Sequence, residues 1–206
     1  MIRPVTVVGA LALMSTLGLG AAYASSMTLS SKMMGAASAT TPVMFPVSVT
    51  ASDGEGHAGR LRAGDKIQLV WSRQINEPSL CSSWSNTSST RSISMTWVAV
   101  DGSTSDDVLQ PGNATGCTGG FHAGTFDMGS AAYVTGGNMT FTGSTTSLTV
   151  GASTTTLTVT LGTSTGGSGV TASGTVGTWT PDAALTDRSG HNSGSNLATT
   201  SATVQW

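Results

Sequence analysis

Charged side chains are scarce in this chain of 206 residues. Asp, Glu, Lys and Arg together make up 9% of the sequence, against about 25% in an ordinary soluble domain. This scarcity excludes a coiled coil or a helical bundle, because both need many charged and long aliphatic side chains on their helix surfaces. It also disfavours nucleic-acid binding, since 8 basic against 10 acidic residues cannot form a dense phosphate-neutralising face.

The usual cysteine and histidine motifs of redox and metal sites are also lacking. The chain has no Cys-x-x-Cys pair, and its three histidines (His57, His122 and His191) do not form a His-x-x-x-His or His-Glu-x-x-His motif. We therefore expect no enzyme activity, and assign no catalytic residue, metal ligand or cofactor.

Small residues and hydroxyls take the place of charge. The sequence contains 30 Ser, 34 Thr and 27 Gly, about 44% of the chain, while five Trp within a 38% apolar fraction argue against disorder. Threonine suits strands, because its β-branched side chain is stiff and its hydroxyl satisfies a wet face without charge. We expect an exported, Thr-rich, all-β protein.

The N-terminus has the pattern of a secretory signal peptide over residues 1–24. Arg3 gives a basic start, an uncharged run follows, and Ala22-Tyr23-Ala24 fits the small-x-small cleavage rule. We predict cleavage between Ala24 and Ser25, an extracellular location, either secreted or at the cell surface, and no membrane contact afterwards. The alternative is an uncut anchor, because the run is about 20 residues long and long enough to span a bilayer.

Export gives a meaning to the two cysteines. An even number of cysteines in an oxidising compartment indicates a disulfide, so we predict a bridge between Cys81 and Cys117. The closed loop of about 37 residues corresponds to about 3–4 kcal/mol in the chain-entropy model.

The mature chain alternates apolar and polar residues from residue 43 onward, after a flexible arm or leading strand at 25–42. The alternating sets predict strands with one buried face; they are Ile67/Leu69/Trp71, Ile93/Met95/Trp97/Ala99, Leu157/Val159/Leu161 and Ala198/Thr200/Ala202/Val204/Trp206. Glycine-rich clusters predict the turns between strands; they include Asp101-Gly102, Pro111-Gly112-Asn113, Gly136-Gly137-Asn138 and Gly166-Gly167. This spacing predicts an antiparallel β-sandwich over residues 43–206.

Two segments resemble bacterial Ig-like domains. One is Gly64-Asp65-Lys66-Ile67-Gln68-Leu69-Val70-Trp71-Ser72 with Ile75-Asn76-Glu77-Pro78-Ser79-Leu80. The other is Thr178-Trp179-Thr180-Pro181, Ala184-Leu185-Thr186-Asp187 and Gly190-His191-Asn192, where a His separates the usual Gly-Asn. The resemblance implies an Ig-like sandwich that serves as an adhesive or spacer module. The leader, with Gly20-Ala21-Ala22-Tyr23-Ala24, is also similar to those of matrix fibre subunits of the TasA and camelysin type.

Three weaker candidate sites remain. The segment Asp53-Gly54-Glu55-Gly56-His57 has three potential metal ligands at alternate positions, but a solvated loop is the favoured interpretation. The loop from Asp101 to Asp107 offers oxygen ligands for Ca²⁺, with a polar turn as the favoured alternative. The aromatic residues suggest a sugar-stacking platform, although Trp at alternating positions is more often core; they are Tyr23, Trp71, Trp84, Trp97, Tyr133, Trp179 and Trp206.

Charge is uneven along the mature chain, because residues 92–187 contain six Asp and no Lys or Arg. Such asymmetry favours contacts between complementary faces. Three functions follow as hypotheses: a surface structural or interaction module, a subunit of an extracellular matrix fibre or pilus-like assembly that uses the 25–42 arm for β-augmentation, and a carbohydrate-binding module. The expected partners are other surface or matrix proteins, cell-wall glycans or further copies of the chain.

Overall fold

Antiparallel strands account for almost all of the regular structure. The computed structural model describes residues 44–54, 59–87, 89–170, 172, 175–193, 198–199 and 206. The predicted signal peptide, its cleavage site at Ala24 and Ser25, and the 25–42 arm lie outside these residues. The elements are β1 (Pro46–Ser52), β2 (Lys66–Trp71), α1 (Glu77–Leu80), β3 (Thr90–Val100), β4 (Val108–Pro111), β5 (Thr125–Asp127), β6 (Val134–Val150), β7 (Thr155–Thr160), β8 (Thr163–Gly169), β9 (Thr178–Thr180) and β10 (Ala198–Thr199).

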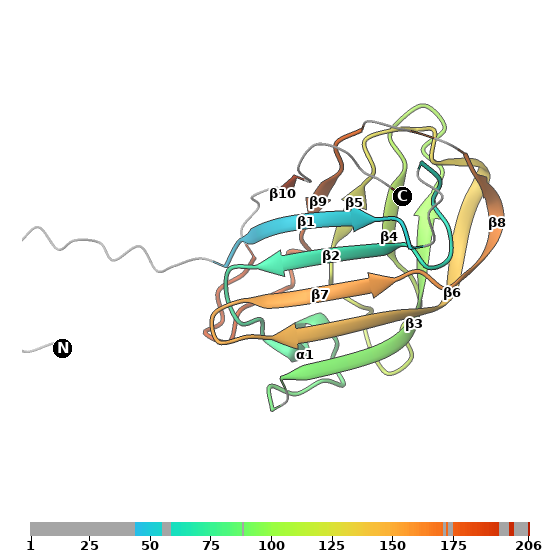
Figure 1. Cartoon of the computed structure of the whole chain (residues 1–206). Coiled ribbons are helices and arrows are strands. Elements are labelled where there is room, and N and C mark those ends of the chain that lie inside the picture. Colours follow the sequence, from blue (N-terminus) through green and yellow to red (C-terminus); the bar gives the residue numbers. More distant parts are fainter. Residues whose placement is uncertain are drawn as a thin grey trace, which may run out of the picture. The chain divides into compact units, whose positions relative to one another are not determined.

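The described strands join into one continuous sheet (Figure 1). Its order is β1-β2-β7-β6-β3-β4-β5-β9-β10, and β8 pairs separately with β6. The two ends of this path, β1 and β10, lie close together, so the sheet is nearly closed. The predicted all-β antiparallel fold is confirmed, whereas the likeness to Ig domains stays a prediction.

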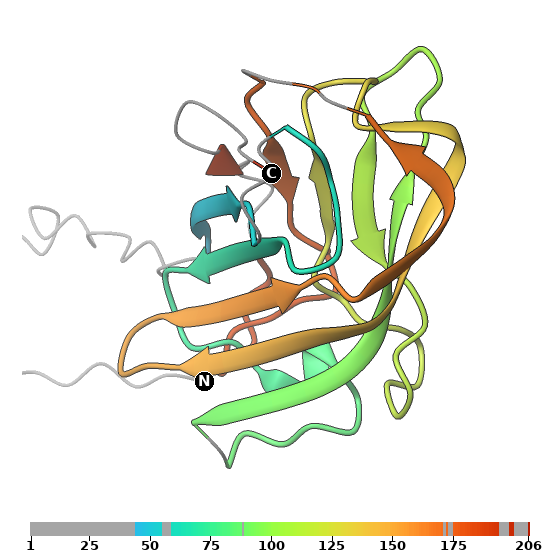
Figure 2. The same ribbon diagram turned by 45° about the vertical axis from the view of Figure 1, so that its right-hand side comes forward.

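Strand β6 contains the bend that allows the sheet to curve until it is nearly closed. Its second half pairs with β7 and its first half pairs with β8, while β3 runs along its other edge. The strand bends between the halves, where Gly143 has a φ of 67° and the register with β3 shifts (Figure 2). Because the sheet bends here, β3 belongs to both sides of the bend, with Thr90–Met95 on one side and Trp97–Val100 on the other.

The alternation seen in the sequence defines the core. Ile67, Leu69 and Trp71 of β2 are buried, as are Leu157 and Val159 of β7, and the intervening polar residues face outward. All five tryptophans are buried, with at most 8% of any residue exposed. Trp71 and Trp179 meet edge to face at 4.7 Å between ring centroids, which joins β2 to β9.

Two predicted turns are wrong. Gly136-Gly137-Asn138 lies within β6, and Gly166-Gly167 lies within β8. The two segments face each other across a register shift between Thr135 and Met139, and Gly136, Gly137 and Gly166 have positive φ. Glycine supplies positive φ to a bulge as readily as to a turn, so composition alone does not separate the two.

Candidate functional site

A cluster of charged side chains lies where β2 ends, beside α1 and the 185–193 segment. Backbone contacts hold the two chain segments together: Asn76 donates to the carbonyl of Thr186 at 2.7 Å, and Arg188 donates to that of Gln74 at 3.1 Å. These are the two segments that carry the resemblance to Ig-like domains. Their meeting places Arg73 beside Asp187 and Arg188, although more than 100 residues separate Arg73 from these two in sequence.

Glu77 is the centre of the cluster. Its side chain is completely buried and accepts from Arg188 Nη2 at 2.9 Å and from Arg91 Nε at 3.2 Å. The sequence places Glu77 in the single turn of α1, with Pro78 following at a position where its missing N–H costs nothing. Two guanidinium groups thus neutralise one buried carboxylate, and the spare positive charge remains at the surface.

Asp187 is the second buried carboxylate, with 2% of its side chain exposed. Arg73 Nη1 donates to it at 2.9 Å, and the backbone N–H groups of Ser189 and His191 donate at 2.8 and 2.9 Å. Burial by itself would raise the pKa of Asp187, but the hydrogen bonds from His191 and Ser189 and the nearby His191 ring lower it below the usual value. Asp187 therefore acts as an ionised anchor for the surrounding loop.

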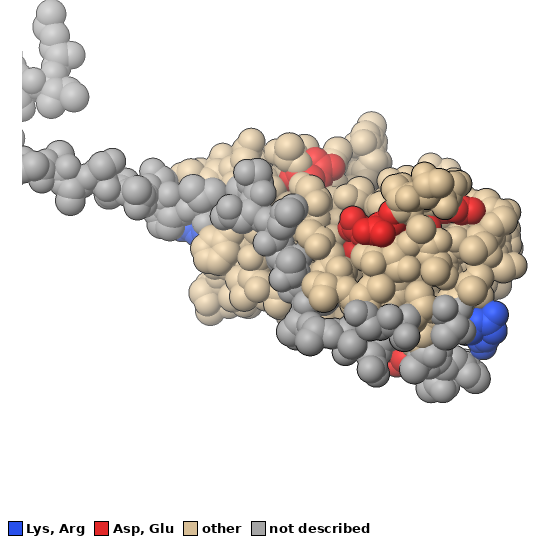
Figure 3. All heavy atoms as spheres, turned by 90° about the horizontal axis from the view of Figure 1, so that it is seen from above, with Lys and Arg blue, Asp and Glu red and all other residues tan. Residues whose placement is uncertain are grey.

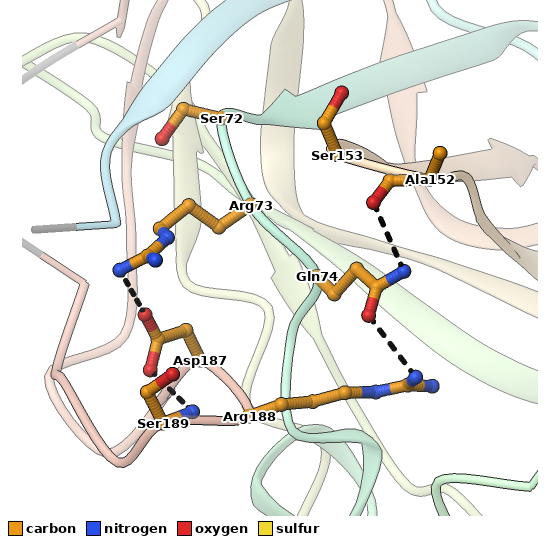
Figure 4. A pocket seen from close by; sticks show the side chains of 8 residues that line it. All are labelled: Ser72, Arg73, Gln74, Ala152, Ser153, Asp187, Arg188 and Ser189. Carbon is orange, nitrogen blue, oxygen red and sulfur yellow. Dashed lines mark hydrogen bonds and ion pairs between the residues drawn. The ribbon is translucent and has the colours of Figure 1, made fainter. Parts of the chain in front are cut away.

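A hollow of about 330 Å³ opens over this cluster (Figure 4). We call it the arginine hollow; it is lined by Ser72, Arg73, Gln74, Ala152, Ser153, Asp187, Arg188 and Ser189. Gln74 lies across its floor, donating to the carbonyls of Gly151 and Ala152 and accepting from Arg188. A second hollow of about 220 Å³ shares Gln74 and Arg188, so these two side chains form a wall between two depressions.

Backbone N–H groups of the loop itself and of β6 hold the loop from Asp101 to Asp107 in place. Asp107 is buried and accepts from the N–H groups of Gly102 and Val134, while Asp101 accepts from those of Ser103 and Gly137. These hydrogen bonds from Gly137 and Ser103 lower the pKa of Asp101. The carboxylates are used as turn acceptors, and no group of three or more His, Cys, Asp or Glu within the described residues is arranged to hold a metal ion.

The predicted bridge between Cys81 and Cys117 is present, with 4.8 Å between the Cα atoms. It ties the residue after α1 to the loop that follows β4. Trp84 and Phe121 pack edge to face at 5.7 Å beside it, so the crosslink is embedded in the core.

The histidines do not come together. His122 pairs with Asp182 at 2.9 Å, and His191 pairs with Asp187 at 3.1 Å. His57 and Glu55 lie outside the described residues, so the candidate at residues 53–57 stays a hypothesis. The predicted aromatic platform finds no exposed indole, because the five Trp and Tyr133 are all buried, and Tyr23 lies outside the described residues.

A Gly-x-Ser-x-Gly pattern occurs at residues 162–166. In hydrolases this pattern places the serine on a sharp turn from a strand to a helix. Here Ser164 lies inside β8, paired with Phe141 of β6, and the hollow beside it is lined by Arg60, Arg62 and Met139 among others. The pattern therefore lacks the local structure of a nucleophile elbow.

Sequence reasoning missed the arginine hollow. Its residues follow no motif, and each arginine is isolated in the sequence. One signal was available, because Arg73 follows the first Ig-like segment and Arg188 interrupts the second.

Among the described residues, no helix has the length and apolar character needed to cross a membrane. The chain matches no family model, no curated protein and no solved structure in the comparisons made.

Proposed function

We propose that this protein is an exported structural or interaction module without catalysis, which contacts its partner through the arginine hollow. The observation that carries the proposal is the state of the charges in that hollow. Glu77 and Asp187 are buried and engaged, whereas the side chains of Arg73 and Arg188 are each 31% exposed. A ligand therefore meets cationic donors and no accessible carboxylate.

The same arrangement is unsuited to acid–base chemistry. A general base needs a pKa near the working pH, whereas the pKa of Asp187 is lowered and both Asp187 oxygens accept hydrogen bonds from neighbouring groups. The nearly closed sheet, crosslinked by Cys81 and Cys117, supplies a rigid support for binding. A disulfide also suits an oxidising compartment, consistent with export.

Expression of the full chain in a bacterial host tests this proposal. We expect the mature protein to begin at Ser25 by mass spectrometry and to be accessible to protease added to whole cells. If the hollow holds it at the surface, raising the NaCl concentration from about 50 to about 500 mM should release it into the medium. Retention inside the cell with an intact leader would contradict the proposal.

A matrix fibre subunit is the second candidate, and the separation of charge along β6 favours it. The acidic β3–β4 loop lies near Met139, which pairs with Ala99, while the arginine hollow lies beyond Val150 at the other end of the strand. The strand between them has a contour of about 35 Å. Figure 3 shows acidic side chains at several places on the face in view, with basic ones only near its left and right margins.

Opposite charges at separated ends suit a head-to-tail contact, which propagates into filaments when the rotation does not close. Electron microscopy of residues 25–206 tests this candidate. Filaments that disappear on deletion of residues 25–42 would favour a fibre over a free module, and a monomer under all conditions would exclude it.

A further inference from the structure

The geometry points to a ligand class for the arginine hollow: we infer that it binds the carboxylate of an acidic sugar. This inference rests on the proposed function and names the chemistry that the site would recognise.

Arg188 is held in place and retains donors. Its Nη1 donates to Gln74 Oε1 at 3.1 Å and its Nη2 to Glu77 Oε1 at 2.9 Å, which fixes the plane of the guanidinium. A guanidinium has five N–H donors in a rigid fork, and the contacts within the described part of the chain account for two of them. The remaining donors belong to a side chain that is 31% exposed and lines the hollow.

The charge balance selects an anion. Three arginines (Arg73, Arg91 and Arg188) surround two carboxylates, and both carboxylates are buried, with 0% and 2% of their side chains exposed. An incoming anion therefore gains attraction from the arginines, and the two acidic groups that oppose it are already ion-paired. A planar carboxylate matches the planar fork of a guanidinium with two parallel hydrogen bonds.

The rest of the lining selects a polyol. Three serines (Ser72, Ser153 and Ser189) supply hydroxyl groups, and Ala152 supplies a small apolar surface. The amide of Gln74 is engaged with Gly151, Ala152 and Arg188, so it offers only the second lone pair of its oxygen. Figure 4 shows these groups around the space between Arg73 and Arg188. A volume of about 330 Å³ lies at the small end of ligand pockets, which suits one sugar ring. The adjoining hollow across Arg188 is smaller, at about 220 Å³.

Sugar recognition here would differ from the aromatic platform predicted from composition. Stacking platforms use exposed aromatic rings, and the described aromatic candidates are buried in this fold. Charge-assisted hydrogen bonds would supply the affinity instead, so binding is expected to weaken as salt concentration rises.

The test is a titration of ¹⁵N-labelled residues 25–206 with D-glucuronate, followed by amide chemical shifts. We expect saturable shifts confined to residues 72–74, 151–154 and 187–189, with a dissociation constant of about 1 mM, as for a single small contact. Neutral D-glucose should cause no saturable shift at the same concentrations, and acetate should bind more weakly than glucuronate because it lacks the hydroxyls.

A matched pair of variants separates the site from general effects on folding. Ser153 is exposed on the β6–β7 turn and belongs to no ion pair, so Ser153→Glu adds a repelling carboxylate beside the hollow while Ser153→Gln has the same size without charge. Both variants lose the Ser153 hydroxyl, so the two are compared with each other: we expect Ser153→Glu to bind glucuronate about tenfold or more weakly than Ser153→Gln does.

Three results of the titrations would overturn the inference, and sedimentation can give a fourth. They are the absence of saturable shifts with glucuronate, equal binding of glucose, and equal weakening by both Ser153 variants. A carboxylate can also come from an acidic side chain of a second copy, and sedimentation of the same samples tests this source. A self-associated species that Ser153→Glu dissociates and glucuronate leaves intact would show that the hollow binds such a side chain. That result also contradicts the inference that the hollow binds an acidic sugar. Each of these results leaves export and surface retention to be judged by the whole-cell experiment.

Discussion

At the scale of single residues, Asp65 is the carboxylate with the clearest cost of burial. It is 2% exposed, and its oxygens accept from the backbone N–H groups of Gly54 and Arg62 at 3.1 and 2.6 Å. Burial raises the pKa of Asp65 from 3.8 to about 6, although these hydrogen bonds oppose the rise. Asp65 thus closes the β1–β2 loop and carries a pH-dependent penalty.

That penalty predicts a direction for stability against pH. Between pH 4 and pH 6 the folded state binds more protons at Asp65 than the unfolded state does, because its folded pKa of about 6 exceeds the unfolded value of 3.8. The contribution of Asp65 to the free energy of unfolding therefore falls as the pH rises from 4 to 6, by at most about 1.4 kcal/mol per pH unit. The contribution is constant below and above that window.

Urea unfolding at intervals from pH 4.5 to pH 7 measures this slope. Asp65→Asn removes the titrating group, so the variant should show a flatter profile than the wild-type protein, whatever its absolute stability. Asp187 does not contribute to the slope in this pH range, because its pKa is lowered and it titrates below the range. Identical slopes in the two proteins would show that Asp65 does not carry the effect.

At the scale of elements, the sequence was most informative where a strand has one wet and one dry face. The alternation in β2 and β7 predicted which residues are buried because each strand is covered on one side only. It was least informative at Gly136 and Gly166, where positive φ serves a bulge between paired strands. Glycine content indicates a special backbone geometry without showing whether the chain reverses there.

The arginine hollow illustrates the same limit for sites. Its ion pairs join Glu77 to Arg188 and Arg73 to Asp187, and both pairs cross from the beginning of the domain to its end. Such pairs depend on the sheet order, because only the closing of the fold brings the 185–193 segment against α1. The disulfide could be predicted because two cysteines in a chain that is expected to be exported leave one intramolecular pairing, whereas these arginines had many possible partners.

The bend in β6 gives an element-scale prediction. Gly162 follows β7, and a Cβ atom there would lie 2.0 Å from the carbonyl oxygen of Thr142 and 2.7 Å from the nitrogen of Ser144. Backbone atoms cannot move aside without disturbing the β6 ladder. We expect Gly162→Ala to lower the free energy of unfolding by about 2 kcal/mol or more, in the range of severe steric changes.

Gly151→Ala is the matched control, because its Cβ would lie 3.3 Å from the Thr154 carbonyl oxygen in the β6–β7 turn, and Gly151 is not among the positive-φ glycines. Chemical unfolding of both variants should show a large loss for Gly162→Ala and a change within about 0.5 kcal/mol for Gly151→Ala. Equal losses would mean that the corner at Gly162 tolerates a side chain.

At the scale of the whole molecule, the fold concentrates a small number of charges. Asp101, Asp106, Asp107 and Asp127 lie in or beside neighbouring loops, because Asp127 pairs across from Val108 in the β4–β5 ladder. Three arginines meet at the other end of β6. The rest of the sheet surface is rich in Thr and Ser and nearly neutral, so it lacks the like-charge repulsion that keeps monomers apart.

The crosslink between Cys81 and Cys117 gives the prediction at this scale. It closes a loop that contains β3 and β4, and it joins the end of α1 to the loop that follows β4. Removing it in a Cys81→Ala/Cys117→Ala double variant should cost about 3–4 kcal/mol, because the unfolded chain regains the conformational freedom of that loop. Both sulfurs are in or beside the core, and alanine avoids placing a hydroxyl there.

Urea unfolding of the oxidised protein, the reduced protein and the double variant measures the effect, and the latter two should agree within about 1 kcal/mol. A double variant as stable as the oxidised protein would show that packing around Trp84 and Phe121 holds this region without the bond.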